Sequence, residues 1–159
     1  MRYSAALALP LAIWPYSTAD DAAQVAASLA TMRVSQTKPA TEIASLPFGQ
    51  ICLLTPYQTN LDGNSADIAR LNDHLRQIGY MSDEMDWALI LDYGDSIKLL
   101  RFERSGAQDI LGTQAAKPPF AGALPPNFAP TDCADSQTAA FAKIEHGGRV
   151  YIVFGAARD

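Results

Sequence analysis

The chain has 159 residues, 48% of them hydrophobic and 18% charged, a composition that is typical of a folded globular protein and excludes a disordered one. Twelve Lys and Arg against 17 Asp and Glu give a formal net charge of −5, and an acidic surface disfavours nucleic acid as a partner. Beyond the N-terminal segment, no apolar run reaches the roughly 18–20 residues that a membrane-spanning helix needs.

Residues 1–19 have the layout of a secretory signal peptide. Arg2 precedes an apolar stretch from Ala5 to Trp14, and Ser17 and Ala19 stand at the −3 and −1 positions of a small-residue cleavage site. This pattern predicts a periplasmic or secreted protein with no stable membrane span after cleavage. A second interpretation is that Ala5–Trp14 is a buried N-terminal segment of a cytosolic protein.

The rest of the chain divides into two parts. Residues 20–49 are expected to form an N-terminal helix and a connector, and residues 50–159 a single α+β domain. Apolar residues at helical spacing predict the helix over 20–35. Pro39 and Pro47 interrupt the connector.

From residue 50 onward the pattern predicts strand, helix, strand, strand, helix, strand. Gly94-Asp95 suits a tight hairpin between the middle strands, and a long proline-rich loop, 105–130, precedes the second helix. The order is that of a ferredoxin-like β-α-β-β-α-β fold, a four-stranded antiparallel sheet in the order 4-1-3-2 with both helices on one face. The expected strands are 51–55, 87–93, 96–104 and 149–154, and the expected helices begin near Ser65 and Thr131 and end near Ile78 and Ile144.

The chain has two cysteines, Cys52 and Cys133. In the expected topology the first strand starts beside the end of the third, where the chain leaves for the second helix, so these two residues lie close together. An exported protein would join them in a disulfide, which stabilises by about 4–5 kcal/mol in the chain-entropy model. The alternative is a pair of buried free thiols.

Motifs for common chemistries are missing from the sequence. There is no phosphate-binding loop, no dinucleotide fingerprint and no nucleophile elbow. His74 and His146 have no neighbouring His or Cys at zinc spacing. The segment 60–64 has the alternating oxygens of a calcium loop, but Ser65 and Leu71 stand where glycine and a bidentate carboxylate are needed. We therefore expect no metal and no cofactor.

One face of the predicted hairpin carries a candidate binding platform. Pairing Tyr93 with Ser96 places Trp87, Tyr93, Lys98, Phe102 and Arg104 along that face, a set that could hold a sugar or a peptide. The alternative is that Trp87 and Phe102 form a cross-strand pair in the core.

A second candidate site is the acidic run Asp83, Glu84 and Asp86, just before the hairpin. Two carboxylates can serve hydrolysis, here with His74 as a possible partner. The alternative is a solvated loop without catalytic function.

The segment from Ile51 to Tyr80 resembles the SPOR family. It carries an apolar strand, then Ala66, Leu71 and Leu75, and then Gly79-Tyr80. The resemblance implies the strand order given above and binding to the glycan strands of peptidoglycan. The tight hairpin and the long proline-rich loop depart from the family pattern, so no binding residue is carried over.

These observations favour an exported, non-enzymatic binding or interaction module of the cell envelope, with an envelope protein or a cell-wall glycan as partner. A secreted hydrolase inhibitor that inserts the proline-rich loop is a variant of this hypothesis. The alternatives are a small periplasmic hydrolase that uses the acidic residues near 83–86, and a structural subunit marked by an exposed apolar patch.

Overall fold

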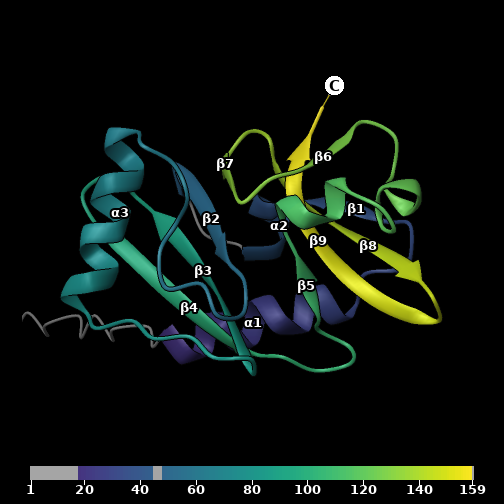
Figure 1. The fold of residues 1–159 in the computed structure, drawn as a ribbon, viewed down its shortest axis with the longest axis horizontal. Coiled ribbons are helices and arrows are strands. Elements are labelled where there is room, and N and C mark those ends of the chain that lie inside the picture. The colour runs from purple at the N-terminus through teal and green to yellow at the C-terminus, as the bar shows by residue number, and fades with distance from the viewer. Residues whose placement is uncertain (1–17, 45–47, 159) are drawn as a thin grey trace, which may run out of the picture.

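The computed structural model describes residues 18–44 and 48–158. The predicted signal peptide therefore lies almost entirely outside the described residues. Figure 1 shows two sheets side by side, with the first two helices between and below them. The fold is α+β with mostly antiparallel strands, as the sequence predicts.

The first sheet has the order β4-β3-β2-β7 and is antiparallel throughout. Helix α3 (Ala66–Gln77) covers one face (Figure 1), where its Leu71 and Leu75 pack with apolar side chains of β2 and β3. The Ser65 side chain caps this helix by accepting a hydrogen bond from the backbone N–H of Ile68. The strands are β2 (Gln50–Leu54), β3 (Asp86–Asp92), β4 (Ile97–Glu103) and β7 (Cys133–Asp135).

The second sheet is built around a long hairpin of β8 (Ala139–His146) and β9 (Arg149–Ala157). The order is β1-β8-β9-β5, β6 also pairs with β9, and the β5–β9 pair is parallel. The smaller elements are β1 (Thr37–Pro39), β5 (Ile110–Leu111), η1 (Thr113–Ala116), η2 (Ala121–Ala123) and β6 (Phe128–Pro130).

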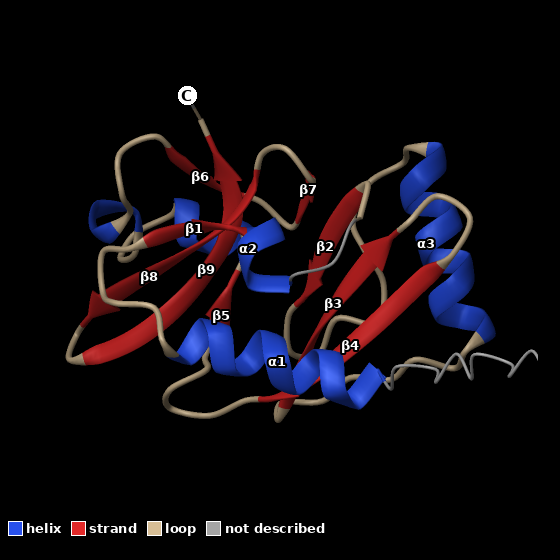
Figure 2. Cartoon of the chain, turned by 180° about the vertical axis from the view of Figure 1, so that it is seen from behind, coloured by secondary structure: helices blue, strands red, loops and turns tan. Residues whose placement is uncertain are grey.

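Helix α1 (Thr18–Ala30) runs across both sheets (Figure 2), and α2 (Ala40–Ala44) lies between them. The first turn of α1 pairs with β4 through Asp21 and Lys98. At its other end, the buried Lys143 of β8 donates to the carbonyl oxygens of Leu29 and Ala30 at 3.4 and 3.1 Å, where a cation also favours the helix dipole. The largest core cluster lies under α1 and α2 and unites residues of both sheets.

The structure corrects the expected second helix over 131–144. This segment forms β7 and β8, and Gly147 and Gly148 do not end a helix. Both glycines have positive φ angles, 60° and 74°, and form the two-residue turn that joins β8 to β9. This is the conformation that a type I′ hairpin turn requires at both central positions.

The strand order also differs from the ferredoxin-like prediction and from the order that the SPOR resemblance implies. The first predicted strand, β2, pairs with β3 and β7 rather than with β4, and the last strand, β9, belongs to the other sheet. The hairpin itself is confirmed, with Trp87 opposite Phe102 and Leu89 opposite Leu100. No helix among the described residues has the length and apolar character needed to cross a membrane.

The predicted disulfide between Cys52 and Cys133 is present. The two residues stand directly opposite each other on β2 and β7, with their α-carbons 4.1 Å apart. The geometric reason differs from the expected one, because Cys133 lies in an edge strand and not at the start of a helix.

Candidate functional site

The structure places two of the five platform residues in the core. Trp87 is fully buried and Phe102 is 5% exposed, and their rings stack with centroids 4.1 Å apart. The indole Nε1 of Trp87 donates to the backbone oxygen of Gln108 at 3.1 Å. A fully buried ring offers no surface to a ligand, so this pair is the cross-strand core pair of the alternative interpretation.

The other three platform residues lie near this pair but have partners in the fold. Lys98 pairs with Asp21 of α1, and Arg104 pairs with Asp109 at 2.7 Å. Tyr93 packs against the main core, and burial raises the pKa of its hydroxyl. The hairpin register places Trp87, Lys98 and Phe102 on one face, and side chains of α1 pack in the main core with Trp87 and Phe102.

Hydrogen bonds with nearby residues hold the acidic run before β3 in place. The Glu84 carboxylate accepts from the hydroxyl of Tyr57 at 2.9 Å, and the Asp83 carboxylate accepts from the backbone N–H of Met85 at 2.7 Å. Asp86 pairs with Arg101 of β4 and accepts from the Ser82 hydroxyl. These contacts shape the loop between α3 and β3, which favours the structural interpretation of the run.

Asp86 carries a pKa shift that does not suit a proton donor. Burial disfavours its charged form, but hydrogen bonds from Arg101, the Asp83 backbone and Ser82 outweigh burial and lower the pKa of its carboxyl below 3.8. An acid catalyst at neutral pH needs the opposite shift. Among the described residues, no three His, Cys, Asp or Glu side chains come together as a metal site would need.

This shift gives a pH dependence of stability. The contribution of Asp86 should be complete above the unfolded-state pKa, near 3.8, and lost as the pH falls through the lower folded-state pKa. We expect Asp86→Asn to lower the urea midpoint at neutral pH and to approach the wild type in strong acid, where both side chains are neutral. Urea titrations across this range measure the difference. Asp95→Asn, at the exposed hairpin turn, is the control, and a difference for Asp86→Asn that is constant with pH would contradict the assignment.

A surface that the sequence analysis did not identify lies beside the acidic run. Four large apolar side chains stand exposed on two neighbouring segments. We call them the methionine edge: Tyr57 (68% exposed), Ile78 (49%), Met81 (71%) and Met85 (59%). The segments are held together by a hydrogen bond from the backbone N–H of Tyr57 to the carbonyl oxygen of Asp83, at 3.2 Å, and by the bond from Tyr57 to Glu84.

Tyr57 adopts an unusual backbone conformation at this edge. Its φ angle is 67°, in the left-handed region that bulky residues seldom adopt. Hydrogen bonds from Thr55 to the Gln58 side chain close the turn around it. The fold thus holds an aromatic ring in solvent at a conformational cost, and such outliers gather at binding sites.

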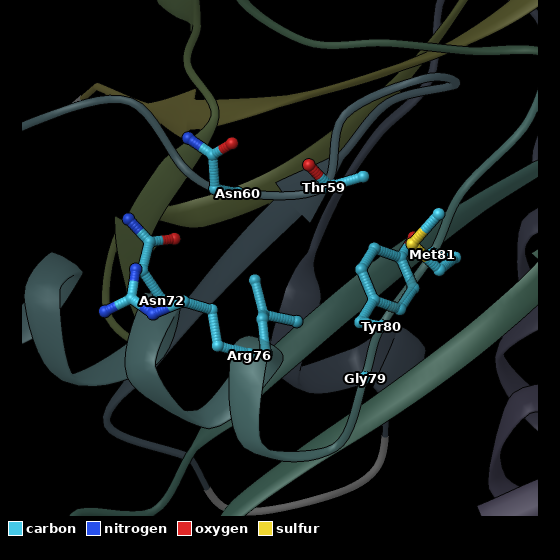
Figure 3. Close-up of a pocket in the computed structure, with 8 residues that line it drawn as sticks. Thr59, Asn60, Asn72, Arg76, Gly79, Tyr80 and Met81 are labelled. Atoms are coloured by element: carbon cyan, nitrogen blue, oxygen red, sulfur yellow. The ribbon is translucent and has the colours of Figure 1, made fainter.

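A pocket of about 570 Å³ lies next to the methionine edge. Figure 3 shows Thr59 and Asn60 on a loop at one side, Asn72 and Arg76 on α3, and Tyr80 and Met81 after the helix. Asn72 fixes the loop through hydrogen bonds with the backbone N–H and oxygen of Leu61, at 2.7 and 3.0 Å. The walls of this pocket are therefore mixed, with amide and guanidinium groups opposite an aromatic ring and a thioether.

The sequence signal for this edge is the spacing of Met81 and Met85 on either side of Asp83 and Glu84. The carboxylates of this segment suggested a site, whereas the two methionines carry no motif of their own. Comparison of the chain with protein-family models, with curated proteins and with solved structures finds no match.

Proposed function

We propose that this protein is an exported, non-enzymatic interaction module that binds a partner protein through the methionine edge. The observation that carries the proposal is the exposure of four large apolar side chains on two segments that hydrogen bond to each other. Exposed large apolar side chains on neighbouring segments favour a protein interface, and the flexible thioether of methionine adapts to varied partner surfaces.

The carboxylates between the two methionines favour a basic partner. Asp83 and Glu84 lie between Met81 and Met85, and the whole chain has a net charge of −5. A partner surface with Lys or Arg around an apolar centre would complement this edge, and opposite charges raise the rate of association.

Export is proposed from one feature of the sequence and one of the structure. The leader over 1–19 has the layout of a signal peptide. Structural disulfides form and persist in oxidising compartments, and this fold contains one. A cell-wall glycan is the competing partner, and the experiment below distinguishes it from a protein.

The test is site-specific photo-crosslinking of the full chain in the envelope of expressing cells. A photoreactive residue in place of Met85 should form one discrete crosslinked protein species, and the same residue in place of exposed Gln137, in the turn between β7 and β8, should not. Tyr57→Asn in the Met85-labelled chain removes the ring and keeps a residue that tolerates positive φ. We expect it to reduce the crosslinked yield by about tenfold, as loss of an aromatic anchor would.

Two outcomes would argue against the proposal. Equal crosslinking from positions 85 and 137 would show random collision, and an unchanged yield with Tyr57→Asn would show that the edge does not bind. Sedimentation of the purified protein with cell-wall sacculi, undiminished by Tyr57→Asn, would favour the glycan.

A further inference from the structure

Two arginines converge on one buried carboxylate between the two sheets. Asp109, just before β5, is 3% exposed. Arg104, which follows β4, donates to it from Nε at 2.7 Å and from Nη2 at 3.3 Å. Arg149, the first residue of β9, donates from Nη2 at 3.0 Å. One buried negative charge therefore orients two positive charges, and the group has a net charge of +1.

Both guanidinium groups keep donors that this carboxylate does not use. Arg104 binds Asp109 through Nε and Nη2, and among the described residues its Nη1 has only a 3.5 Å contact, to the backbone oxygen of Glu84. No described residue accepts a hydrogen bond from Nε or Nη1 of Arg149. The Arg149 guanidinium also lies over the ring of Tyr151, 5.4 Å from its centroid. Asp109 and Tyr151 thus hold donors that are available to a second anion.

The residues of this group line a hollow. Arg104, Asp109 and Arg149 line a pocket of about 300 Å³ together with Ser105, Gly106 and the loop residues Glu84 and Met85. The side chains of Arg104 and Arg149 are 40% and 60% exposed, against 5% for Asp109. Solvent and small ligands therefore reach the arginines, and the exposed Met85 supplies an apolar wall.

The surroundings select against a strongly charged anion. A second hollow shares Met85 and Arg104 with this pocket and is lined by Asp83, Asp86 and Glu103. The Arg–Asp–Arg group carries a charge of +1, but Glu84 also lines the pocket and brings the formal charge of the lining to zero. A carboxylate adds one negative charge to this lining, whereas a phosphate dianion adds two and meets the nearby carboxylates. A planar carboxylate also matches the fork of a guanidinium.

We propose that this pocket binds a carboxylate borne by an apolar group, with Arg104 and Arg149 as its donors and Met85 against the apolar part. The site does not depend on the methionine edge having a protein partner. Two ligands share this chemistry, the C-terminal end of a peptide and a small free carboxylic acid.

The experiment follows the arginine Nε–H and methionine methyl signals by NMR during titration of the oxidised protein with N-acetyl-leucine. We expect saturable shifts of Arg104, Arg149 and Met85, and none with N-acetyl-leucinamide, which lacks the negative charge. Arg149→Gln should weaken binding by about tenfold, the loss of one charge-assisted pair. Arg33→Gln, the same change at an exposed arginine of the α1–β1 loop, should leave binding intact.

A second variant distinguishes a loss of carboxylate recognition from a loss of the folded structure. Arg149→Lys keeps the positive charge but loses the forked guanidinium. It should also weaken the binding of N-acetyl-leucine, while an unchanged melting temperature shows that the fold is intact. N-acetyl-Ala-Ala-Leu identifies the source: tighter binding than N-acetyl-leucine indicates a chain terminus, and equal binding indicates a small acid. Equal shifts with acid and amide, tighter binding of inorganic phosphate, or equal affinities in Arg149→Gln and Arg33→Gln would overturn the proposal.

Discussion

Replacing Cys52 and Cys133 together with alanine should lower the free energy of unfolding by about 4 kcal/mol. The bond joins residues 81 positions apart, so its loss frees a long loop in the unfolded chain. In the folded state it holds β7, a three-residue edge strand, to the centre of the first sheet. For a chain of this length the loss corresponds to a decrease of about 10 °C in the melting temperature.

Urea unfolding of the oxidised protein, the reduced protein and the double variant measures this effect. The reduced protein and the double variant should unfold at nearly the same urea concentration, well below that of the oxidised protein. Intact-mass measurement of the exported protein supports the comparison, since a chain that starts at Asp20 and lacks two hydrogens is expected. Equal urea midpoints with and without reductant would show that the bond contributes nothing to stability.

Local signals account for the elements that the sequence predicted correctly. Gly94 has a φ angle of 88° in the hairpin turn, and no residue but glycine adopts this conformation without cost. The N-cap Ser65 of α3 and Gly79, just after the end of that helix, are local signals of the same kind. Each signal acts within a few residues and does not depend on what the element packs against.

The missed strand β8 shows where such reasoning fails. A half-buried strand alternates apolar and polar residues, but both faces of β8 are covered. Ala139 and Phe141 pack in the main core, and Ala140, Ala142 and Ile144 pack in the cluster behind the second sheet. The first four residues of β8, Ala139–Ala142, are all apolar and have no period of two, and the three alanines among them favour a helix. Burial of both faces of β8 in the tertiary structure therefore outweighs the helical preference of its residues.

The candidate sites depended on contacts that a single sequence does not reveal. The hairpin register placed Trp87 and Phe102 on one face correctly, but only the docking of α1 shows that this face is covered. The Arg–Asp–Arg group joins Asp109 to Arg149, 40 residues further along the chain. Nothing in the local pattern of either residue indicates that they meet.

Trp87→Ala should destabilise the protein by about 3–5 kcal/mol, the usual cost of removing a large aromatic side chain from a core. The indole is fully buried and stacked on Phe102. It also donates to the backbone of Gln108, whose own side chain donates to the carbonyl oxygen of Ala26 in α1 at 3.2 Å. Its removal therefore leaves a cavity and loosens the contact between the hairpin and α1. Urea unfolding measures the loss.

Two further variants test this prediction: Trp87→Phe is a milder change at the same position, and Met85→Ala is a surface control. The phenylalanine variant keeps a ring against Phe102 and should lose less stability, which keeps the test usable if the alanine variant does not fold. Met85→Ala changes a side chain that is 59% exposed and should cost little. Trp87 is the single tryptophan of a chain that starts at Asp20, so its fluorescence reports on this ring alone. An indole that iodide quenches freely in the folded protein, with Trp87→Ala as stable as Met85→Ala, would place the ring at the surface and restore the hairpin as a binding platform.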